Sequence, residues 1–179
     1  MKLFKKLAAA ALAAVLALAM VGCGSSASLK DELLKMAMDQ MTMNGGTANH
    51  SKELDALAAK LVQEADKVAG QDAYKGEDVK TILTADEVVK AAGINTTAKG
   101  YILNAAPNVQ FKSSGAVMEY VQLQWMVKAI NPYTTNDGPN RAVKIGKIEQ
   151  LGDNVDIGVA VGKIGGKEYV VILYANHAA

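Results

Sequence analysis

The chain has 179 residues, a formal net charge of +1 at pH 7, 5% aromatic residues and a single cysteine. This length suits one domain with a hydrophobic core of its own, behind any targeting segment. The balanced charge, without a basic run, argues against a nucleic-acid partner and against a polybasic membrane patch. With one cysteine, the chain cannot form an internal disulfide.

Residues 1–22 have the composition of a signal peptide. Three lysines near the start are followed by an unbroken apolar run over residues 7–21, which is short for a helix that crosses a bilayer. The run ends at Gly22 and Cys23, and a small residue before a cysteine at this point resembles the lipobox of bacterial lipoproteins. A plain secretory signal, or an uncleaved membrane anchor, is the alternative interpretation.

The lipobox resemblance implies that the peptide is cut before Cys23, that the thiol takes a diacylglycerol and that the new amine is acylated, for example with palmitate. Two or three acyl chains anchor a protein stably. We therefore expect a cell-membrane protein, held by lipid on Cys23 and facing the extracytoplasmic side. The expected organisation is a signal peptide at 1–22, the lipidated cysteine with a flexible Gly/Ser-rich tether at 23–28, and one domain at 29–179.

The first predicted helix covers Leu29–Asn44, with Ser28 as its N-cap and a pair of glycines after its end. It carries methionines at positions 36, 38, 41 and 43. Adaptable core filling is the favoured role for them, over a soft binding surface or a metal–thioether site, because methionine fills irregular gaps in cores.

The second predicted helix is the most amphipathic stretch, with apolar residues at helical spacing over residues 54–68. Ser51 or Asn49 is expected to cap its start, and Gly70 to end it. After a polar, turn-like stretch, a capping box that begins at Thr84 predicts one more short helix, stopped by a glycine.

Two loops are the candidate binding surface. Residues 96–112 are predicted as a loop with a possible short strand at 101–103, and loops of this length are often functional. A helix is expected from residue 113 or 114 to about 130, and the Pro- and Gly-containing stretch 131–140 is predicted as an exposed loop. The candidate binding residues on these loops are Asn104, Asn108, Asn136, Asn140 and Arg141.

The stretch 141–174 is predicted to form three antiparallel strands in a row. The second alternates apolar and small or polar residues over 155–162, and a Gly-Gly turn follows it. The third, over 169–174, is apolar on both faces and should be central. Since three strands cannot bury themselves, the helices must cover them. The predicted class is α+β, an αβα sandwich whose antiparallel sheet ends in a three-stranded C-terminal meander.

No catalytic or metal-ligating constellation and no cofactor site is predicted. His50 and His177 fall in a loop and near the chain end, with no His-x-x-x-His spacing, so we interpret both as solvated surface residues. No Gly-x-Ser-x-Gly nucleophile motif occurs. The Gly-rich stretch 162–166 joins two strands instead of opening a helix, which argues against a phosphate loop.

Six short stretches follow the order of parts of one known family. They are Leu33 to Gly45, Glu53 to Ala58, Gly100 to Ala105, Trp125-Met126, Gly138 to Arg141, and Ile157 to Val171. Together they resemble the CAP superfamily of extracellular proteins, which includes cysteine-rich secretory and pathogenesis-related proteins, in its disulfide-free bacterial form. The resemblance implies an αβα scaffold with a groove that binds a lipid, peptide or glycan.

The sequence departs from the CAP pattern at the family's divalent-metal ligands. The histidine of the second helix would fall near Leu61, the glutamate at Tyr101 and the second histidine near Asn140. The resemblance therefore implies a degenerate member that keeps the scaffold without the metal centre.

The favoured interpretation is an envelope-anchored, non-catalytic binding or interaction lipoprotein of CAP-like type, whose ligand is a lipid, a glycan or a protein. A hydrolase of envelope polymers with an unrecognised site is one alternative. A periplasmic assembly or inhibitor protein of another α+β fold, with helices on one sheet face only, is the other.

Overall fold

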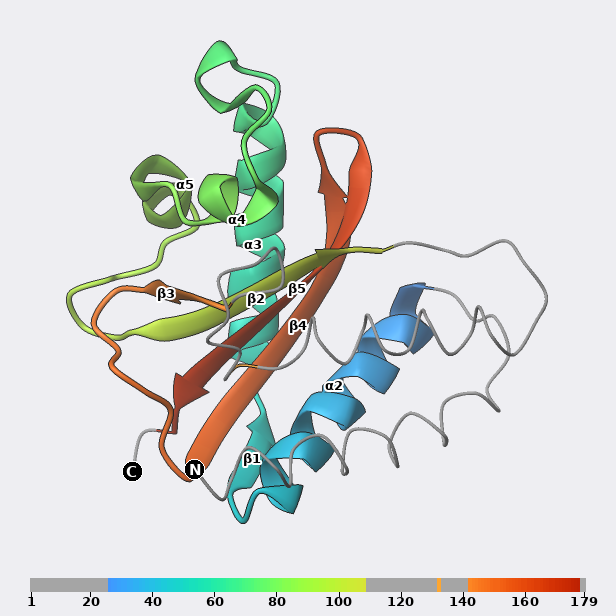
Figure 1. The fold of residues 1–179 in the computed structure, drawn as a ribbon, viewed down its shortest axis with the longest axis vertical. Helices are drawn as coiled ribbons and strands as arrows, with labels where there is room; N and C mark the ends of the chain where they lie inside the picture. Colours follow the sequence, from blue (N-terminus) through green and yellow to red (C-terminus); the bar gives the residue numbers. More distant parts are fainter. Residues whose placement is uncertain (1–25, 109–131, 133–141, 178–179) are drawn as a thin grey trace.

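The computed structural model describes residues 26–108, 132 and 142–177. These residues form one five-stranded sheet with the order β1-β4-β5-β2-β3, packed against helices (Figure 1). Its strands are β1 (Thr47–His50), β2 (Tyr101–Pro107), β3 (Val143–Ile145), β4 (Asn154–Ile164) and β5 (Lys167–Asn176). The predicted α+β class is confirmed. The sheet is mixed and not purely antiparallel, because β1 runs parallel to β4.

The first predicted helix is α2 (Ser26–Met43). It begins three residues before the predicted start, so Ser28 lies inside the helix and not at its N-cap, and residues 26–28 of the expected tether are helical. The chain leaves the helix through Gly45, whose φ of 85° favours glycine. At Gly46 a Cβ would lie 2.7 Å from the Asp153 carbonyl oxygen, so the turn into β1 packs directly against the start of β4.

The second predicted helix is α3 (Lys52–Val68). Ser51 caps it as predicted, because its side-chain oxygen accepts a hydrogen bond from Leu54 N at 3.2 Å. The helix lies close to β4 at two glycines: a Cβ on Gly158 would lie 2.3 Å from the carbonyl carbon of Leu54, and one on Gly162 would lie 2.7 Å from a methyl of Val62. The small residues that alternate along β4 thus form the surface on which α3 packs.

Three short helical segments follow α3: η1 (Asp72–Tyr74), α4 (Val79–Leu83) and α5 (Asp86–Ala91). The predicted capping box at Thr84 is wrong, since α5 has Ala85 at its N-cap position and no side-chain cap. The Thr84 hydroxyl instead donates to the Lys80 carbonyl at 2.7 Å, where α4 ends. The predicted glycine stop is present at Gly93, with a φ of 82°.

Residues 96–112, which are predicted as a loop with a short strand, contain the strand β2 inside the sheet. β2 pairs antiparallel with β5 on one side and with β3 on the other. Residues 101–106 are all buried, which fits a strand covered on both faces. The predicted three-stranded meander is wrong as a consequence: β4 and β5 form the expected hairpin, but β3 pairs with β2 and not with β4. β5 is central, as predicted.

Helices cover both faces of the sheet (Figure 1). On one face, residues of α3, α4 and α5 form a core with alternate residues of β2 and β5, among them Leu61, Leu103 and Leu173. On the other, α2 packs over β4 and β5 through Leu33 and Ile172, among others. The predicted helix that bears Trp125 and the 131–140 loop fall outside the described residues, except Pro132.

The methionines of α2 divide between core and surface. Met36 and Met41 are each 2% exposed and pack in the core, as predicted, whereas Met43 is 46% exposed.

Candidate functional site

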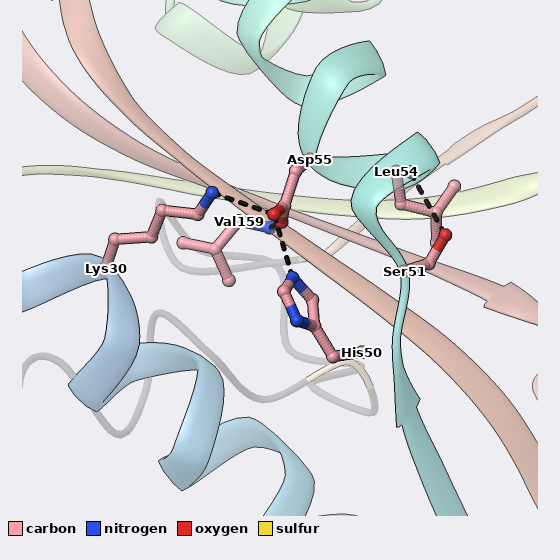
Figure 2. A network of polar contacts seen from close by, with 6 residues as sticks. All are labelled: Lys30, His50, Ser51, Leu54, Asp55 and Val159. Atoms are coloured by element: carbon pink, nitrogen blue, oxygen red, sulfur yellow. Dashed lines mark hydrogen bonds and ion pairs between the residues drawn. The ribbon is translucent and has the colours of Figure 1, made fainter. Parts of the chain in front are cut away.

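The carboxylate of Asp55 has partners on three other elements of the fold (Figure 2). Its Oδ2 accepts a hydrogen bond from Lys30 Nζ at 2.8 Å and lies 2.8 Å from His50 Nε2. Its Oδ1 accepts a hydrogen bond from the backbone N–H of Val159 at 2.8 Å. One side chain of α3 therefore joins α2, β1 and β4. We call Lys30, His50, Asp55 and Val159 the Asp55 junction.

The junction lies where β1 ends along the edge of β4. Ser51 N donates to the Ile157 carbonyl at 2.9 Å, and α3 then begins at Lys52, so the strand cannot continue. The next backbone N–H of β4 that points toward this edge belongs to Val159, and the carboxylate of Asp55, in the first turn of α3, accepts its hydrogen bond. A buried N–H without a partner is costly, and an open strand edge invites pairing with other chains. The carboxylate thus continues the hydrogen-bond ladder for one position.

The surroundings of Asp55 favour its charged form. Its side chain is 13% exposed, while those of Lys30 and His50 are 32% and 35% exposed. Burial alone raises the pKa of Asp55, but the hydrogen bonds from Lys30, from Val159 N–H and from His50 together hold the pKa below its ordinary value. A position in the first turn of a helix also favours negative charge. The carboxylate is therefore ionised at neutral pH.

A second histidine–carboxylate pair lies nearer the start of β4. His177 Nδ1 lies 2.7 Å from Asp156 Oδ1, and His177 N donates to the Asn154 carbonyl at 3.0 Å. Beside them, Asn49 Nδ2 donates to Asn154 Oδ1 at 2.9 Å. Both histidines are exposed, as predicted, but each is paired with an aspartate. Nothing in the sequence indicated these pairs, because folding brings the partners together.

The structure describes two of the five predicted binding residues, Asn104 and Asn108, and their surroundings differ. Asn104 is fully buried inside β2 and not in a loop, and its Oδ1 accepts the N–H of Ala105. Asn108 follows β2 and is held to β5: its amide donates to the Glu168 carboxylate, and its backbone N–H to the Glu168 carbonyl. Cys23, Asn136, Asn140 and Arg141 fall outside the described residues.

Two further buried polar groups lie away from the junction. Lys80 is 5% exposed, and burial lowers its pKa to about 8 against the opposing charge of Asp78. On α2, the Oε1 atom of Gln40 is buried without a hydrogen-bond partner in the part of the chain that the structure describes.

Within residues 26–108, 132 and 142–177, no group of three or more His, Cys, Asp or Glu side chains is placed to hold a metal ion. None of the helices described is long and apolar enough to span a bilayer. Comparison of the chain with protein-family models, with curated proteins and with solved structures found no match.

Proposed function

We propose that the protein is an extracytoplasmic lipoprotein of the cell envelope, anchored by lipid on Cys23. The observation that carries the proposal is the position of the lipobox-like cysteine relative to the fold: the helix α2 begins at Ser26, three residues after it. The predicted signal segment, the proposed lipidation site and the packed domain would thus follow one another in the order that this class of protein requires.

For the domain itself, we propose a non-catalytic binding or interaction role of CAP-like type, without the family's metal ligands. Helices on both faces of the sheet support this proposal over a fold with helices on one face. Two positions where the family's ligands would fall, Leu61 and Tyr101, are buried in the same apolar core. The leucine side chain has no atom that could bind a metal ion.

The candidate surface for a lipid, glycan or protein ligand includes the polar end of the sheet. There Asn49, Asn154, Asp156 and His177 are at least partly exposed and hydrogen-bonded to one another. Because these donors and acceptors are already held in place, little conformational entropy is lost when a ligand binds them. The loop predicted at 131–140 is included in this candidate surface because its prolines and glycine predict an exposed loop.

A hydrolase of envelope polymers is the second candidate, and one observation favours it. Asp55 holds His50 through Nε2, and no hydrogen bond to Nδ1 is found among the described residues. A histidine oriented by a carboxylate can act as a general base. The test is turnover of isolated envelope polymer: activity that is lost in a folded His50→Ala variant would put this candidate first.

The lipoprotein proposal is tested by labelling cells that express the full chain or a Cys23→Ala variant with a traceable fatty acid. We expect the parent protein to be cleaved and to carry the label in the membrane fraction, and the variant to be an unlabelled precursor of larger size. Two unlabelled chains of equal size in the membrane fraction would count against lipid anchoring and favour an uncleaved apolar anchor.

A further inference from the structure

Helix α2 and strand β4 run in opposite directions on one side of the sheet (Figure 1). The end of α2 leads into β1, where Thr47 N donates to the Asp153 carbonyl at 2.6 Å, just before β4 begins. Near the start of α2, Lys30 reaches Asp55 beside Val159, in the middle of β4. The start of α2 therefore points toward the end of the sheet that carries the β4–β5 turn.

Chain length limits how far the lipidated residue can lie from this end. Cys23 and Ser26 are three residues apart, and an extended chain spans about 11 Å over that separation. From Lys30 back to Ser26 the helix rises about 6 Å. Covalent geometry therefore allows Cys23 to reach at most about 17 Å beyond the level of Lys30. The six residues of β4 from Val159 to the turn at Gly165 cover about 20 Å. At full extension the anchor can thus come close to the level of the turn.

We propose that the tip of the β4–β5 hairpin, residues 163–167, rests against the anionic headgroups of the membrane beside the lipid anchor. The opposite end of the sheet, with β1, Asn154 and His177, then faces away from the membrane. This inference rests on the proposed lipidation of Cys23, and it assigns the membrane-facing surface of the domain.

The chemistry of the hairpin tip fits such a surface. Lys163 and Lys167 are exposed on either side of Gly165 and Gly166, and lysines near an anionic membrane surface are attracted to it. Three acidic side chains of α3 and β5 have partners of their own: Asp66 Oδ1 accepts the Gly165 N–H at 2.9 Å, Glu64 pairs with Lys67, and Glu168, opposite Lys163 in the hairpin, accepts from Asn108.

The tip is also held in place. Ile164 is 3% exposed and packs in the core formed with α3. The bond from Gly165 to Asp66 ties the turn to the last part of the same helix. A tip fixed to the domain at this point sets the orientation of the whole domain when it meets the membrane.

The test uses the lipidated mature chain in vesicles of phosphatidylethanolamine and phosphatidylglycerol. Because Cys23 is the only cysteine and lipid occupies its thiol, an introduced cysteine is the one site for a thiol-reactive fluorophore. Two variants are compared: Asp153→Cys at the opposite end, and Gly70→Cys, which leaves both lysines in place and follows Ala69, whose Cβ lies 3.5 Å from a Cβ built on Gly165. A nitroxide on the lipid headgroup quenches only fluorophores near the membrane surface.

We expect several-fold stronger quenching at position 70 than at position 153. Equal quenching at the two positions, or stronger quenching at 153, with mass spectrometry showing lipid on Cys23, would overturn the orientation alone. A Cys23 without lipid would overturn both the orientation and the lipoprotein proposal. A fluorophore at 70 that is shielded from an aqueous quencher, but not quenched from the headgroups, would point to a protein contact and contradict the proposal.

Discussion

The Oδ1 atom of Asp55 accepts a hydrogen bond from the backbone N–H of Val159, 104 residues further along the chain. This contact extends the sheet edge past the end of β1, while the Oδ2 atom of the same carboxylate holds Lys30 of α2 and His50 of β1. The helical layers on both faces of the sheet are thereby joined at one side chain.

Asp55→Ala is expected to destabilise the domain by about 1–3 kcal/mol, because it leaves the Val159 N–H without its acceptor and Lys30 without its partner. Chemical denaturation measures this change. The matched control is Asp39→Ala, which breaks the exposed pair with Lys35 and should cost no more than about 0.5 kcal/mol. Equal effects of the two substitutions would show that the junction contributes nothing beyond a surface ion pair.

The stability contributed by Asp55 should depend on pH in the acid range. Since its pKa is lower in the folded protein than in the unfolded chain, the unfolded state binds the proton more readily. The contribution is fully present above the unfolded pKa of about 4 and is lost as the pH falls through the folded value. The difference in unfolding free energy between parent and Asp55→Asn should shrink with acidification below about pH 4. A difference that grows there would contradict the assigned direction.

Lys80 predicts a dependence of the same sign at alkaline pH. Burial lowers its pKa from 10.5 to about 8, so the unfolded chain binds the proton more strongly between these values. The stability associated with Lys80 should therefore increase as the pH rises from about 8 to 10.5. Comparison of unfolding curves for the parent and Lys80→Met over this interval isolates the effect. A parent protein that loses stability relative to the variant over the interval would rule it out.

Gly158→Ala should destabilise the domain by about 1–3 kcal/mol or more, because the added methyl would overlap the backbone of α3 at Leu54. Thermal unfolding provides the measurement. Gly70→Ala serves as the control, since a Cβ there meets no atom within 4 Å. A Gly158→Ala protein as stable as this control would show that α3 moves away from β4 at no cost.

Local patterns in the sequence were sufficient to predict the elements that carry a clear period. The spacing of apolar residues over 54–68 and the Ser51 cap predicted α3, and the alternation in β4 with its Gly-Gly turn predicted the hairpin. β2 was missed over most of its length, because Asn104 and Pro107 interrupt the pattern and a short run that is apolar on both faces has no period. With β2 missing, β3 was assigned to the wrong neighbour.

The Asp55 junction could not be predicted from the sequence. On the helix pattern, Asp55 belongs to the charged face of α3, and nothing local indicates a partner in β4. The parallel pairing of β1 with β4 brings Asp55 and Val159 together. β1 has only four residues, between a pair of glycines and the cap of α3, and so short a stretch gives little indication of a strand. Contacts of this kind depend on topology, which short-range patterns do not encode.

Mass spectrometry of the N-terminal peptide of the protein, purified from membranes, shows whether Cys23 is the lipidated first residue of the mature chain. We expect a chain that begins at Cys23 and carries a diacylglyceryl group on the sulfur, with or without a further acyl chain on the amine. A chain that begins elsewhere, or a Cys23 with an unmodified thiol, would contradict the lipoprotein proposal.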